Sequence, residues 1–180
     1  MEILFEGIIL RPWSINDAKV LVEIANNKNI ADNLQDLFPF PYSLKDARKW
    51  LKSILQVDPP RNFAVIVDNK VVGNIGILTK DDIHRKNIEI GYFLSEKYWG
   101  QGIAARAVKA ITSYGFSNFD VVRVYAETFA DNARSRRTLE KAGFALEATL
   151  RRNIIKNGIL KDSCIYSVLK EEFKYFLTTE

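Results

Sequence analysis

The stretch 98–105 reads Tyr-Trp-Gly-Gln-Gly-Ile-Ala-Ala and gives the clearest indication of the fold. The apolar run 88–94 comes just before it, and apolar residues then recur at helical spacing at Ile103, Ala107 and Ile111. The order is therefore strand, glycine-rich turn and helix. Two glycines let the backbone approach a ligand closely, and the first helical turn presents unpaired N–H groups and a partial positive charge. This arrangement predicts a phosphate-binding turn.

The spacing of the glycines argues against two nucleotide-binding turns. A dinucleotide-binding turn reads Gly-x-Gly-x-x-Gly, and Ala105 stands at its third glycine position. The Gly-Lys-Ser/Thr ending of a P-loop is missing as well. Taken alone, the stretch is equally compatible with an ordinary tight turn that leads into a helix.

Landmarks elsewhere in the chain give this turn a context. The segment 132–135 (Asn-Ala-Arg-Ser) opens another helical stretch, which runs to 140–144 (Glu-Lys-Ala-Gly-Phe). With these segments the chain resembles the GNAT superfamily of acetyl-CoA-dependent N-acetyltransferases. Within it, the chain is most similar to the RimJ/RimL group, whose named members acetylate N-terminal residues of ribosomal proteins. The other matching landmarks are 10–12, 17–18, 40–42, 46–47, 50–51, 72–76, 89–92, 98–102, Gly158 and Asp162.

Two positions depart from the superfamily pattern. The family motif begins with Gln or Arg three residues before the first glycine of its Gly-x-Gly/Ala core, which aligns with 102–104. Trp99 stands there, and tryptophan is common at this point in RimJ/RimL-like chains. Relatives often continue with Thr-Glu-Ala, where this chain has Ala-Arg-Ala at 105–107. Arg106 is compatible with a phosphate contact, but a side chain that faces water is the better interpretation.

Composition indicates a globular protein, and we expect one N-acetyltransferase domain over 1–180 with its core at about 8–170. Apolar residues make up 47% of the 180 residues and charged residues 27%. No apolar run approaches the ~20 residues that span a bilayer, and the acidic start of the chain lacks the basic region of a signal peptide. Cys164 is the one cysteine, so no intrachain disulfide forms. These features favour a cytoplasmic protein without membrane association.

The net charge of +4 also raises the question of nucleic-acid binding. Basic residues are interspersed with 22 acidic ones, and no RNA-binding motif is present. We therefore expect no direct nucleic-acid binding, since a basic surface suits an anionic co-substrate equally well.

The pattern of elements predicts an α/β (α+β) fold with a mixed, mostly antiparallel sheet of about seven strands flanked by helices, in keeping with the GNAT-like resemblance. Capping signals start helices at Ser14 and Ser43, and Asn-Gly at 157–158 is the strongest hairpin signal. The expected strands are 3–10, 63–67, 71–78, 88–94, 121–129, 144–155 and 159–169. The other expected helices are 101–117, 132–142 and a short one within 170–177.

Acetyl transfer to an amine requires a base, because an α-amino group (pKa ~8) is mostly protonated at neutral pH. Glu89 is the best candidate. It interrupts the apolar strand 88–94 and shares a strand face with Gly91, which leaves room for a substrate. In several GNAT relatives a glutamate on this strand serves as base, often through water. The alternative is a solvated carboxylate that pairs with Arg85 or Lys86.

Ser135 is the best candidate for the acid that assists the leaving thiolate. Many GNAT enzymes place a tyrosine just before the Glu-Lys-x-Gly-Phe run, and here that position is Leu139. In the RimJ/RimL group a serine three residues after the asparagine is thought to reach the sulfur of the co-substrate, and Ser135 occupies that place. The alternative is a first-turn serine that bonds the helix backbone.

The expected co-substrate is acetyl-CoA. Backbone N–H groups of the turn would hold its pyrophosphate, and the strand edge 92–94 would pair with its pantetheine amides and supply the oxyanion donor. Asn132 caps its helix and, from the family pattern, also contacts pantetheine. The expected acetyl-CoA-binding residues are Tyr92, Phe93, Leu94, Trp99, Gly100, Gln101, Gly102, Ile103, Ala104, Asn132 and Ser135.

Several other residues have both a functional and a structural interpretation. The stripe Arg134, Arg137 and Lys141 suits the 3′-phosphate of the co-substrate or an outer charged face. The apolar segment 38–42 favours the acceptor pocket over a mere core cover. His84 fits a solvated loop, Cys164 fits the core, and no metal site is expected.

Together these features predict an N-acetyltransferase whose amine acceptor attacks acetyl-CoA directly in a ternary complex. The resemblance favours a protein N-terminal amine. A polyamine, an antibiotic or an amino-acid-like amine is the alternative acceptor, and a non-catalytic acyl-CoA-binding module is an alternative of another class. A monomer and a homodimer are both compatible with the sequence.

Overall fold

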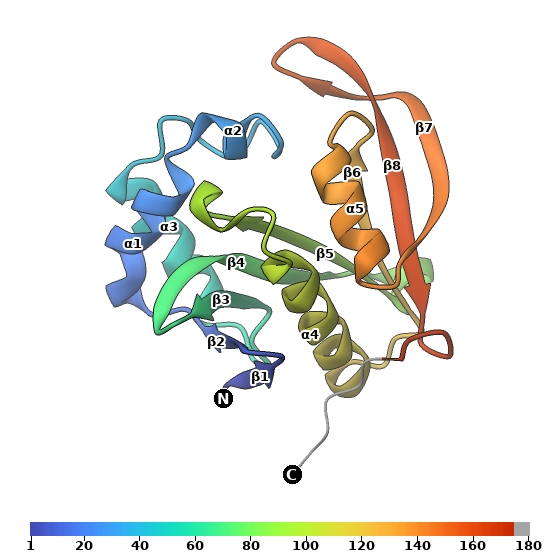
Figure 1. Cartoon of the computed structure of the whole chain (residues 1–180), viewed down its shortest axis with the longest axis horizontal. Coiled ribbons are helices and arrows are strands. Elements are labelled where there is room, and N and C mark those ends of the chain that lie inside the picture. Colours follow the sequence, from blue (N-terminus) through green and yellow to red (C-terminus); the bar gives the residue numbers. More distant parts are fainter. Residues whose placement is uncertain (175–180) are drawn as a thin grey trace.

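The computed structural model describes residues 1–174, which form one eight-stranded sheet with helices on both faces (Figure 1). The sheet order is β1-β2-β3-β4-β5-β6-β8-β7. The strands are β1 (Ile3–Phe5), β2 (Ile8–Pro12), β3 (Asn62–Val67), β4 (Lys70–Thr79), β5 (Asn87–Leu94), β6 (Arg123–Phe129), β7 (Ala145–Lys156) and β8 (Ile159–Leu169). The α-helices are α1 (Ala18–Ala25), α2 (Lys28–Ala31), α3 (Leu44–Ile54), α4 (Ile103–Asn118) and α5 (Ala133–Lys141). Short 3-10 turns are η1 (Ile15–Asp17), η2 (Asp82–His84) and η3 (Glu96–Tyr98).

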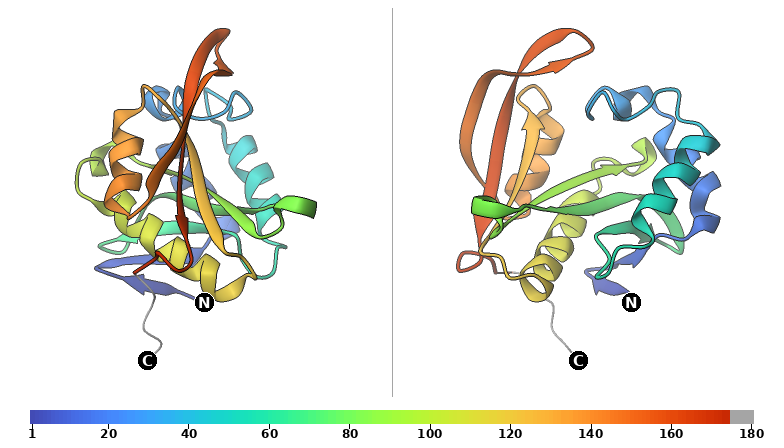
Figure 2. Two further views of the ribbon diagram at one scale, coloured as in Figure 1. Left: turned by 90° about the vertical axis from the view of Figure 1, so that its right-hand side faces the viewer. Right: turned by 180° about the vertical axis from the view of Figure 1, so that it is seen from behind.

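The centre of the sheet decides where a ligand can enter. All neighbouring strands are antiparallel except β5 and β6, which run parallel and pair only between Asn87–Glu89 and Arg123–Tyr125. Beyond this point β5 continues beside β4, while β6 continues beside β8. The sheet therefore divides into two arms, and Figure 2 shows them spreading apart.

Each face of the sheet has its own apolar core. The larger core packs α4 against the sheet and includes Ile75, Ile88, Ile111 and Tyr166. The smaller core lies on the opposite face, where α1 and α3 cover β2 and β3 (Figure 1). The larger core holds both of the strands that separate, because it contains Ile88 and Ile90 of β5 and Val124 of β6.

Local signals in the sequence account for most element boundaries. Capping boxes join Ser14 with Asp17 and Ser43 with Asp46, as expected from their spacing. Asn157 has a φ of 50° and Gly158 a φ of 78°, which is the left-handed backbone that a tight hairpin requires.

Three expectations about elements are corrected. The strand expected at 3–10 is a hairpin, because Glu6 (φ 44°) and Gly7 (φ 80°) form a left-handed turn, and the sheet consequently has eight strands. The stretch after α1, where no regular element was predicted, contains the four-residue α2. No helix forms over 170–174, which make a turn, and the rest of the tail expected to be helical lies outside the described residues. Within 1–174, no helix has the length and apolar character needed to cross a membrane.

Candidate active site

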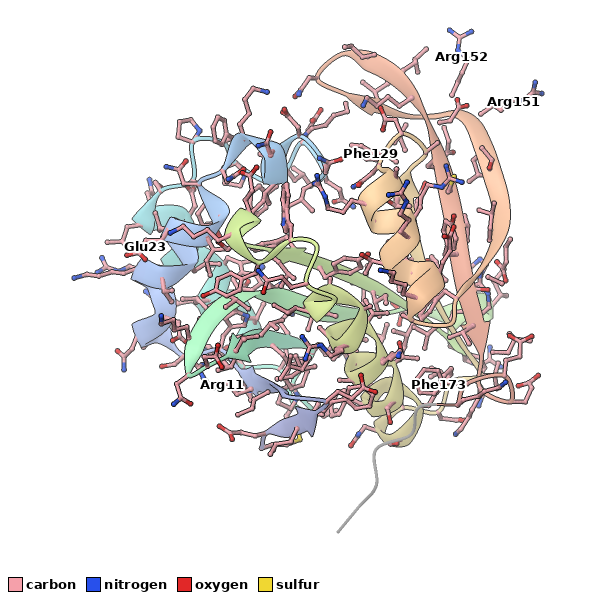
Figure 3. The ribbon with its side chains drawn as sticks, in the orientation of Figure 1. Arg11, Glu23, Phe129, Arg151, Arg152 and Phe173 are labelled. Carbon is pink, nitrogen blue, oxygen red and sulfur yellow. The ribbon has the colours of Figure 1, made fainter. Side chains whose placement is uncertain are left out.

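A cavity of about 850 Å³ occupies the gap between the two arms of the sheet. Its walls come from β5, β6, the first turn of α5, the segment 29–42 and α3. Phe129, at the end of β6, lies at the opening of this gap on the side of α2 (Figure 3). The cavity brings together most of the expected site residues: Glu89, Tyr92, Phe93, Leu94, Trp99, Ala104, Asn132 and Ser135.

The glycine-rich turn leaves the start of α4 open. Gly100 (φ 78°) and Gly102 (φ 74°) are left-handed, and a Cβ at either position would meet no atom within 4 Å. The helices α2, α3 and α5 are each capped by a side chain, from Asn27, Ser43 and Asn132 respectively, whereas no side chain caps α4. The first N–H groups of α4 are therefore available to an anion.

The remaining turn residues present backbone rather than side chains to such a ligand. Ile103 is 1% exposed and belongs to the larger core, and the amide of Gln101 donates to the carbonyl of Lys97. Trp99 is fixed by a 2.9 Å hydrogen bond from its indole Nε1 to the Leu94 carbonyl, and the Arg134 guanidinium lies 4.0 Å from the centre of its ring. Gly100, Gln101, Gly102 and Ile103 do not line the cavity itself.

The outer half of β5 has one strand edge open to the cavity. From Ile90 to Leu94 this strand pairs with β4 on one side and no longer pairs with β6 on the other. Its backbone N–H and C=O groups on that side are available to an extended ligand, as in the addition of a strand to a sheet edge.

Glu89 sits where β5 and β6 separate, opposite Tyr125 in the parallel register. Its Oε2 accepts hydrogen bonds from Lys80 Nζ (2.6 Å) and Tyr125 Oη (3.2 Å). Oε1 has no hydrogen-bond partner among the described residues, so this oxygen is free to meet a substrate. The alternative pairing is wrong: Lys86 pairs with Asp120, and Arg85 bonds the Asp82 carbonyl.

The neighbours of Glu89 keep fixed protonation states. Burial alone would lower the pKa of Lys80, but its hydrogen bonds to Glu89 and Tyr125 outweigh this effect and raise the pKa. Burial also raises the pKa of Tyr125, and the charge of Glu89 adds to the rise. An ammonium and a neutral phenol therefore both donate to Glu89 at neutral pH.

Ser135 lies in the first turn of α5, across the cavity gap from the outer half of β5. Asn132 Oδ1 accepts its backbone N–H (3.1 Å), so Asn132 is the N-cap that the sequence predicts. Ser135 Oγ lies 2.9 Å from Tyr92 Oη. Burial raises the pKa of Tyr92 to about 12. The hydroxyl of Ser135 thus meets a protonated phenol.

Comparisons with known proteins identify the family of this site. The family described as the acetyltransferase (GNAT) domain matches residues 8–145. The chain belongs to the GNAT acetyltransferases. It is an N-acetyltransferase by family, and its eight-stranded mixed sheet is the GNAT fold.

The similar proteins span several activities. The uncharacterized N-acetyltransferase YoaA of Bacillus subtilis (strain 168) is 37% identical over 101 residues, which are 56% of each chain. The prophage-derived uncharacterized N-acetyltransferase YokL of the same organism is 30% identical over 171 residues, covering 94% of this chain and 93% of its own. The structure of RimL, a ribosomal L7/L12 alpha-N-protein acetyltransferase in complex with coenzyme A, superposes with a TM-score of 0.84 at 21% identity (94% and 98% covered). Spermidine N-acetyltransferase from Vibrio cholerae, in complex with CoA and spermine, gives 0.78 at 20% (93% and 98%).

The far wall of this GNAT cavity is aromatic and amide-rich. Phe38 stacks on Tyr42 with ring centres 5.0 Å apart and meets Phe93 edge-on at 5.7 Å. Within the segment 38–42, Phe38 and Tyr42 line the cavity, and Tyr42 also packs into the smaller core.

An ion pair joins the segment after α2 to the β7–β8 hairpin beside this wall. Lys156, 7% exposed at the end of β7, lies 3.0 Å from Asp36 in the segment that follows α2. Asp36 accepts a hydrogen bond from the Lys156 side chain and another from the Asn157 backbone, and these two bonds lower the pKa of Asp36. The β7–β8 hairpin is thereby tied to the wall that carries Phe38.

Sequence reasoning missed three participants of the site. Lys80 and Tyr125 reach Glu89 from other strands, and the Tyr92 side chain reaches Ser135, where only its backbone was expected to act. None of these contacts leaves a local pattern in the sequence. Cys164 is buried, as expected, and His84 lies in the exposed turn η2.

Proposed function

We propose that this GNAT enzyme transfers the acetyl group of acetyl-CoA to the N-terminal amine of a protein or peptide by direct attack in a ternary complex. One observation carries the proposal. A continuous cavity joins an open strand edge, beside an uncapped helix start, to a carboxylate with one free oxygen. The first two features suit an extended, phosphate-bearing thioester, and the third suits an amine that must lose a proton.

The residues divide the work of the reaction. Glu89 Oε1 accepts a proton from the amine, directly or through water, as the amine nitrogen bonds to the acetyl carbon. A backbone N–H at 92–94 donates to the carbonyl oxygen as it gains negative charge. The C–S bond then breaks, the electron pair leaves with sulfur, and the Ser135 hydroxyl donates a hydrogen bond to that thiolate.

The charges around the cavity favour a single amine over a polyamine. The carboxylates among its described lining residues are Asp46, Glu89 and Glu127, and each already accepts a hydrogen bond from a protein group. Lys49 and Arg134 add positive charge to the same lining. A polycation would need more unengaged carboxylates than this. Amide side chains that suit a peptide backbone line the acceptor side, namely Gln35 and Asn62. The other amides of this lining already bond protein groups: Asn29 bonds Glu96, Asn33 bonds the Asn29 carbonyl, and Asn74 bonds Trp13.

The test measures acetyl-CoA binding by isothermal titration and then thiol release with peptide N-termini, polyamines and small amines. We expect binding, and turnover with peptides. Turnover confined to polyamines or small amines would replace the proposed acceptor. Binding without turnover on any amine would support the non-catalytic module instead, and absence of binding would refute the proposed co-substrate site.

The variant Glu89→Gln separates catalysis from binding. Loss of the general base is expected to reduce turnover about 10²- to 10⁴-fold, with acetyl-CoA affinity unchanged. Glu23→Gln is the matched control, because Glu23 is exposed on the outer side of α1 (Figure 3). Turnover of Glu89→Gln equal to that of Glu23→Gln would remove Glu89 from the mechanism.

A further inference from the structure

We propose that Tyr92 is a positioning residue that aims the hydroxyl hydrogen of Ser135 into the cavity, toward the sulfur of the bound thioester. The inference rests on the proposed function and deepens it. It assigns a task to a side chain that reaches the site from β5 rather than from α5.

The contact is specific in its geometry. Tyr92 Oη lies 2.9 Å from Ser135 Oγ and 3.4 Å from the Ser135 carbonyl oxygen, so the side-chain contact is the shorter one. Both residues line the cavity. The backbone N–H of Ser135 donates to the side-chain oxygen of its cap residue, Asn132. Asn132 therefore holds the backbone of Ser135, and Tyr92 contacts its hydroxyl.

Either oxygen of the Tyr92–Ser135 contact can donate, and Tyr92 is assigned here as the donor. A serine hydroxyl has one hydrogen and two acceptor lone pairs. When the protonated Tyr92 donates to Ser135 Oγ, the one hydrogen of Ser135 stays available for a further acceptor. A thiolate with a pKa of ~8.5 does not remove the proton from a phenol whose pKa burial has raised to about 12. Tyr92 therefore orients and polarises the serine, and it keeps its own proton throughout the reaction.

Another hydroxyl of α5 bonds its own helix backbone. Thr138 donates its hydroxyl to the carbonyl of Arg134, four residues back (3.0 Å). Serine and threonine form such bonds readily within helices, and a hydroxyl so engaged donates nothing to a ligand. Ser135 Oγ instead lies 2.9 Å from Tyr92 Oη, and Tyr92 is also hydrogen-bonded to the Thr138 side chain.

The neighbouring position on α5 offers no alternative donor. Leu139 is fully buried in the larger core, at the place where a helix tyrosine was considered from the family pattern. The phenol near the first turn of α5 is thus that of Tyr92 from β5, while Leu139 on the helix packs in the core.

The experiment compares Tyr92→Phe, Ser135→Ala and the double variant by two readouts. The first is steady-state turnover with saturating acetyl-CoA. The second is the pKa of the thiol of bound CoA, from its thiolate ultraviolet absorbance, which depends on hydrogen-bond donors near sulfur and not on the acceptor. Tyr114→Phe is the matched control, because Tyr114 is a buried tyrosine of α4 that bonds the Pro60 carbonyl (2.9 Å) outside the cavity.

We expect Tyr92→Phe to lower kcat about 5- to 30-fold and to raise the pKa of the bound thiol, with the KM for acetyl-CoA unchanged. The double variant should match Ser135→Ala in both readouts, because Tyr92 acts through Ser135. Tyr114→Phe should change neither. Two results would overturn the inference while CoA binding persists. One is an unchanged thiol pKa in Tyr92→Phe, and the other is a loss of kcat in the double variant equal to the product of the losses in the two single variants. Failure of the parent protein to bind CoA would instead refute the proposed function, and this inference with it.

Discussion

The two walls of the cavity are built in different ways. The wall that would face acetyl-CoA consists of regular elements, namely β5, α4 and α5, and these rest on the larger core. The wall that would face the acceptor combines the segment 29–42 with α3 and borders the β7–β8 hairpin. It contains the four-residue α2, and Asp36–Lys156 ties it to the hairpin.

This difference has a physical consequence for specificity. A rigid wall of regular structure can hold the constant co-substrate, whereas a wall of irregular segments can change its shape without disturbing the core. The fold consequently determines the transferred group more firmly than the acceptor. RimL and a spermidine acetyltransferase both superpose on this chain at about the same quality, 0.84 and 0.78.

The largest effect on one wall alone is expected from Gly102→Ala. A Cβ at this left-handed position (φ 74°) would meet no protein atom within 4 Å, so it would occupy open space beside the start of α4. We expect acetyl-CoA affinity to fall about 10- to 100-fold, as charge-assisted N–H contacts are lost, with the acceptor KM little changed. Isothermal titration measures the first quantity and steady-state kinetics the second.

Gly7→Ala provides the matched control for this variant. Gly7 has nearly the same φ, 80°, but lies in the turn between β1 and β2, away from the cavity. Both variants carry a similar backbone strain of about 1 kcal/mol. A fall in acetyl-CoA affinity in Gly102→Ala alone would therefore come from the position of Gly102 and not from the strain. Equal affinities in the two variants would show that the turn does not bind the co-substrate.

A smaller effect, on stability, is expected at the support of the acceptor wall. Asp17 accepts two hydrogen bonds from Arg11 (2.8 and 2.9 Å) and one from the Ser14 N–H (2.8 Å). Burial would raise the pKa of Asp17, but these bonds outweigh it and lower the pKa. Asp17→Asn should reduce the free energy of unfolding by about 1–2 kcal/mol. Acetyl-CoA affinity at low temperature should stay constant.

The pH dependence of that loss checks its origin. Because the folded-state pKa is lowered, the ionised Asp17 contributes fully above the ordinary value of 3.8, and its contribution disappears as the pH falls through the lower folded value. Denaturant unfolding of parent and variant over this range should therefore show converging stabilities in acid. Asp46→Asn removes a capping box that has no arginine partner. It should therefore reduce the free energy of unfolding by less than Asp17→Asn does. A difference between parent and Asp17→Asn that does not vary with pH would contradict this account.

The smallest effect is expected where the acceptor wall meets the β7–β8 hairpin. Lys156→Met removes the ion pair with Asp36 but keeps the aliphatic stem, so the segment that carries Phe38 should become less well held. We expect the acceptor KM to rise about 3- to 10-fold, with acetyl-CoA affinity unchanged. Lys86→Met, which removes the ion pair with Asp120 outside the cavity, is the control. Equal kinetics in the two variants would mean that the acceptor wall does not depend on this link.

Sequence patterns were sufficient at most positions where a few consecutive residues decide a conformation. The glycines at 100 and 102, the cap at Asn132, the capping boxes and the Asn157–Gly158 hairpin all follow from local backbone chemistry, and the structure contains each of them. The same reasoning failed at 3–10, where a run of apolar residues outweighed the Glu6–Gly7 turn signal. The expected roles of Glu89, Ser135 and the turn residues stay predictions until the variants are measured.

By itself, then, the sequence determined the strand–turn–helix unit, the order of the elements and the place of Glu89 on its strand. Only the tertiary structure decided that Tyr125 lies opposite Glu89, that Lys80 reaches the same oxygen, and that Tyr92 meets Ser135. The reason is one of range. Caps and turns depend on neighbours within about four residues, whereas these contacts join residues between 9 and 43 positions apart through the register and divergence of β5 and β6.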